Sequence, residues 1–401
     1  MHTLPGSHQE KVNGTSPPLQ IPFHRACVGE EEVQAVSEVI RSGWLTMGPK
    51  TIEFESEFAR FIGVQYAIAV SSCTAALHLS LEAAGVGPGD EVLVPTTTFT
   101  ATAEVVTYLG AKPVLVDVDA QTLNLDPADA VRRITPRTRA IVPVHFAGQP
   151  CEMATIRELS EKHGLHVIED AAHSLPASYR GAHIGTLSEL TAFSFYATKT
   201  LTTGEGGMIT TNNAAYAERI RNMRLHGIGR DAWKRYSAAG SWHYEVLDAG
   251  FKYNMTDIQA ALGLVQLTKC ASMREQRCQI AARYTSAYQN MGSLEPPTLL
   301  ANRESSWHLY VLRLRDSHLR IGRDDFITEL DKRGIGTSVH FIPLHLHPYY
   351  QDTFGYHRGD FPVAEREYER CLSLPIYPGM TSEEIDCVIE AVCAISEDHL
   401  A

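Results

Sequence analysis

Short apolar runs alternate with helix-like segments through the first half of the chain. Buried strands are predicted for the runs YAIAVS (66–71), EVLVP (91–95), KPVLVDV (112–118), AIVPVHF (140–146) and HVIED (166–170). The segments between them have helical periodicity, as in AALHLSLEAAG from Ala75, which ends at a glycine. This alternation predicts an α/β fold with a mostly parallel sheet and helices on both of its faces.

The pattern changes after residue 190. The runs AFSFYA (192–197) and GGMITT (206–211) are separated by only a short glycine-rich loop. Two apolar runs so close together pair most simply as antiparallel neighbours. We therefore expect an edge or mixed part of the sheet at this point.

A second unit is predicted beyond Gln289. Candidate strands at 308–314 and 337–342 flank the helical segment GRDDFITELDKRG. The last helix should begin after Thr381, whose hydroxyl can cap it while Glu384 completes a capping box. The expected organisation is a flexible segment over 1–20, a large α/β domain over 21–289 and a smaller C-terminal α+β domain over 290–401.

Composition narrows the class of protein. Hydrophobic residues make up 44% and charged residues 20%, the balance of a globular chain with a sizeable core. The formal net charge of −12 argues against a nucleic-acid or acidic-membrane surface, which needs clustered Lys and Arg. The eight cysteines form no CxxC pair. No apolar run reaches the roughly 20 residues that a bilayer requires, and the opening segment lacks the apolar core of a signal peptide. We expect a reduced, cytoplasmic location with no nucleic-acid or membrane partner.

The motif IEDAAHS (168–174) places Asp170 at the end of a predicted buried strand. The carboxyl ends of parallel strands are the edge at which open α/β sheets bind ligands. A carboxylate there can pair with a ligand cation. The alternative is that Asp170 only caps the following helix.

The motif SFYATKTLTTGEGGM (194–208) places Lys199 between an apolar strand and a glycine-rich turn. Such an environment can desolvate an amine and keep it nucleophilic, so that it forms a Schiff base. The alternative is a surface lysine in a loop. Hydroxyl side chains suited to a phosphate surround it, and glycines allow close backbone approach: Ser194, Thr198, Thr200, Thr202, Thr203, Gly204, Gly206 and Gly207.

The run Ser71 to Thr74 lies at a predicted helix start. Free N–H groups and the helix dipole favour a phosphate there, although an ordinary Ser/Thr cap has the same residues. With Asp170 and Lys199, this run supplies the three anchors of pyridoxal 5′-phosphate (PLP): a phosphate cradle, a pyridinium partner and an aldehyde partner.

The sequence resembles the DegT/DnrJ/StrS family of sugar aminotransferases through IEDAAHS, SFYATKTLTTGEGGM, RLHGIGRD (224–231) and GFKYNMTDIQAA (250–261). The resemblance spans about residues 21–395 and is nearest to nucleotide-sugar 4-aminotransferases of the aminoarabinose type. It implies a fold-type-I PLP enzyme that works as a homodimer with active sites at the subunit interface. It also implies L-glutamate and a nucleotide-linked keto-sugar as substrates.

The resemblance assigns roles to individual residues. Lys199 matches the lysine that bonds the cofactor, and Asp170 matches the residue that keeps the pyridine nitrogen protonated. Phe99 matches the aromatic residue that stacks on the cofactor ring. His173 lies where the family has Gln or His near the ring's phenolic oxygen. The expected catalytic residues are therefore Lys199, Asp170 and His173, and for Phe99 and His173 the alternative is core packing.

The remaining cofactor contacts are also implied by resemblance. Ser72, Cys73 and Ser194 match phosphate contacts, and Asn254 matches an asparagine that reaches the phosphate of the neighbouring subunit's cofactor. Two positions depart from the family pattern. Cys73 replaces a smaller residue, and Tyr196 stands where close relatives often have His.

The sequence admits three other interpretations. The histidines of VHFIPLHLHPYY (339–350) could be metal ligands, but the resemblance places this segment at the sugar pocket, and we expect no metal. A PLP-dependent sugar dehydratase shares the fold but replaces the lysine with histidine, so Lys199 argues against it. A non-catalytic ligand sensor is also possible on the same scaffold, and the intact Lys199 and Asp170 argue against that too.

Overall fold

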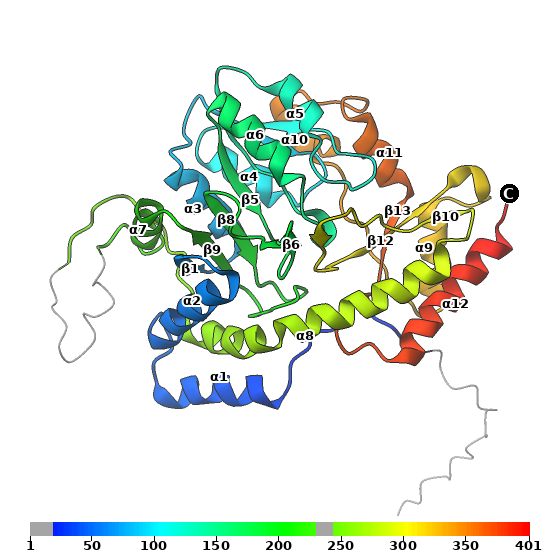
Figure 1. The fold of residues 1–401 in the computed structure, drawn as a ribbon, viewed down its shortest axis with the longest axis horizontal. Helices are drawn as coiled ribbons and strands as arrows, with labels where there is room; N and C mark the ends of the chain where they lie inside the picture. Colours follow the sequence, from blue (N-terminus) through cyan, green and yellow to red (C-terminus); the bar gives the residue numbers. More distant parts are fainter. Residues whose placement is uncertain (1–18, 230–243) are drawn as a thin grey trace, which may run out of the picture.

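The computed structural model describes residues 19–229 and 244–401, shown as coloured ribbon in Figure 1. Residues 1–18 of the segment predicted to be flexible lie outside this range. So do the last two residues of the motif RLHGIGRD, 230 and 231. No helix within the described ranges combines the length and the apolar composition needed to cross a membrane.

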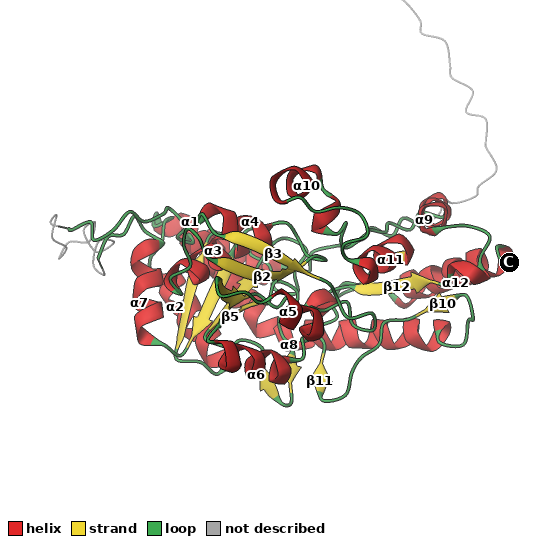
Figure 2. Cartoon of the chain, turned by 90° about the horizontal axis from the view of Figure 1, so that it is seen from above, coloured by secondary structure: helices red, strands yellow, loops and turns green. Residues whose placement is uncertain are grey.

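The elements alternate along the first half of the chain as predicted (Figures 1 and 2). The strands are β1 (Tyr66–Val70), β2 (Glu91–Pro95), β3 (Lys112–Val116), β4 (Thr138–Ile141), β5 (His166–Asp170), β6 (Ser178–Tyr179), β7 (Ala182–His183), β8 (Leu190–Ser194), β9 (Gly207–Thr211), β10 (Leu294–Glu295), β11 (Arg303–Glu304), β12 (Tyr310–Leu314) and β13 (Cys371–Leu374). The α-helices are α1 (Glu30–Ser42), α2 (Pro49–Ile62), α3 (Cys73–Ala83), α4 (Ala101–Tyr108), α5 (Pro127–Arg133), α6 (Met153–His163), α7 (Ala214–Met223), α8 (Asp257–Tyr288), α9 (Arg323–Lys332), α10 (Pro348–Phe354), α11 (Pro362–Arg370) and α12 (Ser382–Asp398). Short 3₁₀ turns are η1 (Phe146–Gly148), η3 (Asp316–His318) and η4 (Leu344–Leu346).

The main sheet has seven strands in the order β1-β9-β8-β5-β4-β2-β3. The strands β8, β5, β4, β2 and β3 are parallel, whereas β9 pairs antiparallel with both β1 and β8. The predicted α/β fold is confirmed, as is the antiparallel pairing of the runs at 192–197 and 206–211. The sheet is mixed, with β9 inside it and β1 at its edge.

Side chains that alternate along each strand build two cores, one on each face of the sheet. Ile68 and Val70 of β1 pack into the core that α3, α4 and α7 cover. Ala67 and Ala69, on the opposite face, pack into the core that α2, α6 and α8 cover. This arrangement follows from the period-2 alternation of a strand buried on both sides.

A third core gathers residues from the end of α8 onward with β10, β12, β13, α9 and α12. In both views α8 runs from beneath the main sheet to this part of the chain (Figures 1 and 2). The predicted capping box of α12 is confirmed: Thr381 accepts from the N–H of Glu384, whose carboxylate accepts from the N–H of Thr381. The division into domains at 289/290 stays a prediction.

The strand predicted over 337–342 is wrong. Within it only Ser338 forms a bridge, to Ser373 of β13, a strand that the sequence pattern did not reveal. Instead of alternating across a sheet, His340 and Phe341 both line the cavity described below. Period-2 spacing alone therefore misled the prediction here.

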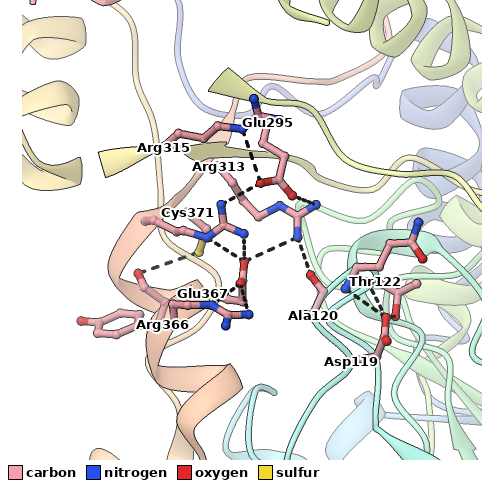
Figure 3. A network of polar contacts seen from close by, with 12 residues as sticks. Asp119, Ala120, Thr122, Glu295, Arg313, Arg315, Arg366, Glu367 and Cys371 are labelled. Carbon is pink, nitrogen blue, oxygen red and sulfur yellow. Dashed lines mark hydrogen bonds and ion pairs between the residues drawn. The ribbon is translucent and has the colours of Figure 1, made fainter. Parts of the chain in front are cut away.

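A buried network of charges joins the third core to the main sheet (Figure 3). The side chains of Arg313 on β12 and Glu367 on α11 are each 2% exposed and lie 3.5 Å apart. Arg313 also pairs with Glu295 at 2.8 Å and donates to the carbonyl of Ala120, after β3, at 2.7 Å. Arg370 contacts both carboxylates, at 2.6 Å to Glu367 and 2.8 Å to Glu295. Arg366 and Arg315 lie 3.0 Å from Glu367 and 4.0 Å from Glu295, so four arginines surround two carboxylates and hold β10, β12, α11 and the loop after β3 together.

Replacing Arg313 with methionine should lower the free energy of unfolding by about 3 kcal/mol, because a buried carboxylate loses one of its cations. This is the low end for a broken buried pair, since Arg366 and Arg370 remain beside Glu367. Urea denaturation measures the change. Arg60→Met is the matched control: Arg60 is 70% exposed and pairs with Glu57, so its loss should cost less than about 1 kcal/mol. Equal losses in the two variants would contradict a stabilising role for the buried network.

Candidate active site

A cavity of about 460 Å³ opens at the carboxyl ends of the parallel strands. It brings together seven of the eight residues expected to bind the cofactor, namely Ser72, Cys73, Phe99, Asp170, His173, Ser194 and Lys199. They come from the start of α3, the loop before α4, the ends of β5 and β8, and the loops that follow those two strands. The parallel sheet gathers them because its strands all end at one edge.

Lys199 lies in the loop after β8, where its N–H donates to the carbonyl of Tyr196 at 2.9 Å. The residue as a whole is half-buried, but its amine points into the cavity wall, with Nζ 3.3 Å from Nε2 of His308. Desolvation of the amine lowers the pKa of Lys199 to about 8, against the opposite pull of Asp170. A useful fraction of the side chain is therefore a neutral nucleophile near neutral pH.

Asp170 ends β5 and is 4% exposed. Its Oδ2 accepts from the hydroxyl of Thr102 at 2.8 Å, and its Oδ1 accepts from the N–H of Ala172 at 3.0 Å. Burial raises the pKa of Asp170, while these two donors and Lys199 pull in the opposite direction. Within the described ranges Asp170 has no cation within ion-pair distance, so a cationic group of a ligand would fit beside it.

The start of α3 approaches β9 closely. Ser72 caps α3 by accepting from the N–H of Ala75 at 3.1 Å, and the first N–H groups of the helix have no partner within the helix. A Cβ on Gly207 would lie 2.5 Å from the carbonyl oxygen of Ser72, so only glycine fits at that position. Burial raises the pKa of the Cys73 thiol well above its usual range, which keeps this helix start free of negative charge. These features suit a phosphate.

Aromatic rings line another side of the cavity. Phe99 is 61% exposed, and its ring centroid lies 6.1 Å from that of Phe341. The ring of His173 stacks on Phe341 at 5.9 Å and lies 4.4 Å from the ring of His308. Burial lowers the pKa of His173 well below its usual range, so its imidazole is neutral. An exposed Phe99 ring is free to stack on a flat ligand.

Part of the expected phosphate environment does not face the cavity. Ser194 and Thr198 line it, but the hydroxyls of Thr202 and Thr203 donate to the backbone carbonyls of Phe195 and Glu205, at 3.2 and 2.6 Å. These hydrogen bonds stabilise the glycine-rich turn. Buried hydroxyl groups form hydrogen bonds with nearby backbone carbonyls, so these two are not available to a ligand. The expectation that these two threonines serve a phosphate is wrong.

Asn254 stands apart from the other predicted residues. It forms a bridge to Val70 at the end of β1, and it accepts from Lys252 and donates to the carbonyl of Met255. It does not line the cavity of its own chain. Its expected contact with a neighbouring subunit's cofactor stays a prediction.

The cavity also contains residues that sequence reasoning missed as site residues, above all His308 and Phe341. His308 lies two residues before β12, and no motif or spacing ties it to Lys199. His340 was weighed as a metal ligand, but its Nδ1 contacts the Ser373 hydroxyl at 2.9 Å, and His345 is bonded elsewhere, between Thr96 and Glu365. The described residues contain no cluster of three or more side chains suited to a metal ion.

Comparison with known proteins identifies relatives of this chain. The DegT/DnrJ/EryC1/StrS aminotransferase family matches residues 26–393. The spore coat polysaccharide biosynthesis protein SpsC of Bacillus subtilis is 50% identical over 373 residues, which cover 93% of this chain and 96% of SpsC.

Solved structures give the same result. Spr1654 from Streptococcus pneumoniae, solved in PLP and PMP (pyridoxamine phosphate) forms, is 34% identical; its PMP form superposes with a TM-score of 0.89 over 95% of this chain and 98% of that one. PseC of Helicobacter pylori, an aminotransferase involved in the biosynthesis of pseudoaminic acid, is 28% identical, with a TM-score of 0.88 over 95% of this chain and 100% of PseC.

Fold and relatives together define a PLP-dependent aminotransferase. The chain belongs to the DegT/DnrJ/EryC1/StrS aminotransferase family and is a sugar aminotransferase. The residues present fit the cofactor. Asp170 offers a carboxylate that no cation of the described residues pairs with, the start of α3 offers N–H groups without a partner in the helix, and Lys199 presents a desolvated amine to the same cavity.

Proposed function

We propose that this enzyme moves the amino group of L-glutamate to the carbonyl of a keto-sugar linked to a nucleoside diphosphate, a UDP- or dTDP-4-keto sugar, in amino-sugar biosynthesis for a glycan, a lipopolysaccharide or an antibiotic. The observation that carries the proposal is the shared cavity of Lys199, Asp170 and the start of α3. The choice of glutamate and of a nucleotide-linked sugar rests on the family resemblance.

The geometry of each group supports the role that the family resemblance assigns to it. Lys199 would hold the aldehyde carbon of PLP, Asp170 its ring nitrogen, and Ser72, Cys73 and Ser194 its phosphate. Bound there, the cofactor supplies an electron sink for the carbon that loses or gains the amino group. Once released, the Lys199 amine acts as the base that moves a proton at that carbon. Its depressed pKa favours this role, because a base must be unprotonated at working pH.

Asp170 and the aromatic residues support that chemistry. A buried carboxylate beside the ring nitrogen stabilises a proton on that atom through direct charge attraction, which the low-dielectric site strengthens. Phe99 would pack on one face of the ring, and His173, neutral and buried, would lie near the ring's phenolic oxygen. Neither a dehydratase nor a ligand sensor is favoured by any feature of the site.

A substrate panel tests the proposal directly. Purified enzyme loaded with PLP is incubated with L-glutamate and UDP-, dTDP- or GDP-linked sugars that carry the keto group at C4 or at C3. We expect 2-oxoglutarate and an amino-sugar nucleotide, detected by mass, with a 4-keto sugar, and no product with the Lys199→Ala control. Amination of free keto-sugars alone, or use of a donor other than glutamate, would contradict the substrate assignment.

The role of Asp170 is tested by Asp170→Asn. The amide keeps the shape: its oxygen can accept from the N–H of Ala172 and its NH2 can donate to the Thr102 hydroxyl, but it cannot hold a proton on the ring nitrogen. Turnover should fall by about 10²- to 10³-fold while PLP stays bound. Asp126→Asn is the control, because Asp126 only caps α5 and asparagine caps equally well. Near-normal turnover of Asp170→Asn with bound PLP would make Asp170 a structural cap.

Assembly is the third point to test, because we propose a homodimer in which Asn254 reaches the partner's cofactor phosphate. Such an amide contact is worth about 1.5–3 kcal/mol, so Asn254→Asp, which adds repulsion, should release PLP without unfolding the chain. Mixing this variant with inactive Lys199→Ala protein puts both lesions on one site of each heterodimer and leaves the other site whole. Activity should partly return.

Differently tagged subunits show whether heterodimers form. If they co-purify and no activity returns, the phosphate contact is made within one subunit, and the proposed interface role of Asn254 is wrong. Mixing either variant with itself serves as the control, because those dimers contain no intact site.

A further inference from the structure

His308 lies against the lysine amine and is held firmly. It is 6% exposed, and its Nε2 lies 3.3 Å from Nζ of Lys199. Its backbone carbonyl accepts from the guanidinium of Arg277, which is fully buried on α8 and also donates to the carbonyls of Trp307 and Ile376. The position of the imidazole is therefore set by the backbone and by packing against His173.

The partners of the two ring nitrogens decide which of them carries the proton. The Nδ1 of His308 is buried and has no hydrogen-bond partner among the described residues. If Nδ1 carried the proton, a buried N–H group would lack an acceptor, which native structures rarely tolerate. With the proton on Nε2, only a bare lone pair remains at Nδ1, and Nε2–H points at Lys199. A hydrogen bond from Nε2–H requires a lone pair on Nζ, which only the neutral amine has.

The groups around Lys199 weaken the preference of its amine for the charged form. Burial lowers the pKa of His308 well below its usual range and that of His340 to about 4, so these rings carry no charge near neutral pH. Arg277 is a nearby cation and Asp170 a nearby anion. The titratable groups that interact with Lys199 are His24, Cys73, Asp170, His173, Arg277, His308 and His340. Among them only His308 makes a hydrogen bond to the amine.

We propose that His308 is a positioning residue that donates Nε2–H to the Lys199 amine and thereby stabilises the neutral form of the released lysine. This inference rests on the proposed function, in which the free amine of Lys199 acts as the base. A neutral amine can take up a proton at once, whereas an ammonium must first lose one inside a buried site. His308 thus favours the form of Lys199 that can act as the base. The ring of His173, whose centroid lies 4.4 Å from that of His308, holds the donor ring in place.

The tautomer of His308 can be measured without any substitution. Full-length protein labelled with ¹⁵N-histidine is loaded with pyridoxamine 5′-phosphate, which fills the cavity and leaves Lys199 as a free amine. Long-range ¹H–¹⁵N NMR spectra distinguish a ring protonated at Nε2 from one protonated at Nδ1, and a His308→Gln sample assigns the signal. We expect the Nε2–H tautomer at neutral pH. A ring protonated at Nδ1, or at both nitrogens, would overturn the proposal.

Substitutions test the consequence for Lys199. A hydrogen bond to the neutral amine favours that form, so its loss in His308→Leu should raise the pKa of Lys199. Acetylation of Lys199 by trace acetic anhydride at pH 7, read by peptide mass, should then slow by about three- to tenfold, the worth of one neutral hydrogen bond. His308→Gln, whose amide N–H can also donate, should recover most of that rate.

His340→Leu is the matched control, because it removes from the same cavity a half-buried imidazole that makes no hydrogen bond to Lys199. Its acetylation rate should stay close to that of the unaltered enzyme. Faster or unchanged acetylation in His308→Leu would overturn the proposal, because His308 would then accept from an ammonium or have no effect. Neither measurement uses a sugar or an amino donor, so a failed substrate panel leaves this result intact and vice versa.

Discussion

A lysine amine and an aspartate carboxylate are buried in one cavity, and the two described side chains form no ion pair with each other. Burial opposes charge on both groups, which lowers the pKa of Lys199 to about 8 and raises that of Asp170. Burying these two groups without partners costs free energy. A ligand that offers a carbon to which the amine can bond and a cation beside the carboxylate offsets that cost. The remaining features of the site maintain this arrangement, including the donors on Asp170, the imidazole beside Lys199 and the aromatic walls.

The sheet makes the arrangement possible. Asp170 ends a parallel strand, and the chain of β8 continues directly into the loop of Lys199, so neighbouring strands deliver both groups to one edge. The antiparallel strand β9 then runs past the start of α3. At Gly207 the backbone of β9 lies so close to the backbone of Ser72 that any side chain would collide with it. The buried arginine and glutamate network fixes the third core against this framework, and His308 and His340 enter the cavity from that side.

Strong local signals in the sequence predicted well. Five strands, the antiparallel pair and the α12 capping box depend on patterns that neighbouring residues express directly, as do the positions of Asp170 and Lys199, whereas Phe99 and His173 were expected at the cavity from the family resemblance. Residues placed by tertiary packing were missed. His308 reaches Lys199 because Arg277 donates a hydrogen bond to the backbone carbonyl of His308. These two residues are 31 positions apart, and no sequence motif indicates their contact. The run 337–342 has the spacing of a strand, yet His340 and Phe341 turn to the cavity, and Thr202 and Thr203 are taken up by carbonyls of their own turn.

The central claim is that Lys199 is the residue that bonds the cofactor. Sodium borohydride reduces the C=N bond between a lysine and PLP to a stable linkage, so reduction of the PLP-loaded enzyme followed by proteolysis and peptide mass mapping locates that lysine. The account predicts a single phosphopyridoxyl group on the peptide that contains Lys199, and none on enzyme first converted to its pyridoxamine form. A phosphopyridoxyl group on any other lysine, such as Lys252 beside Asn254, would contradict it.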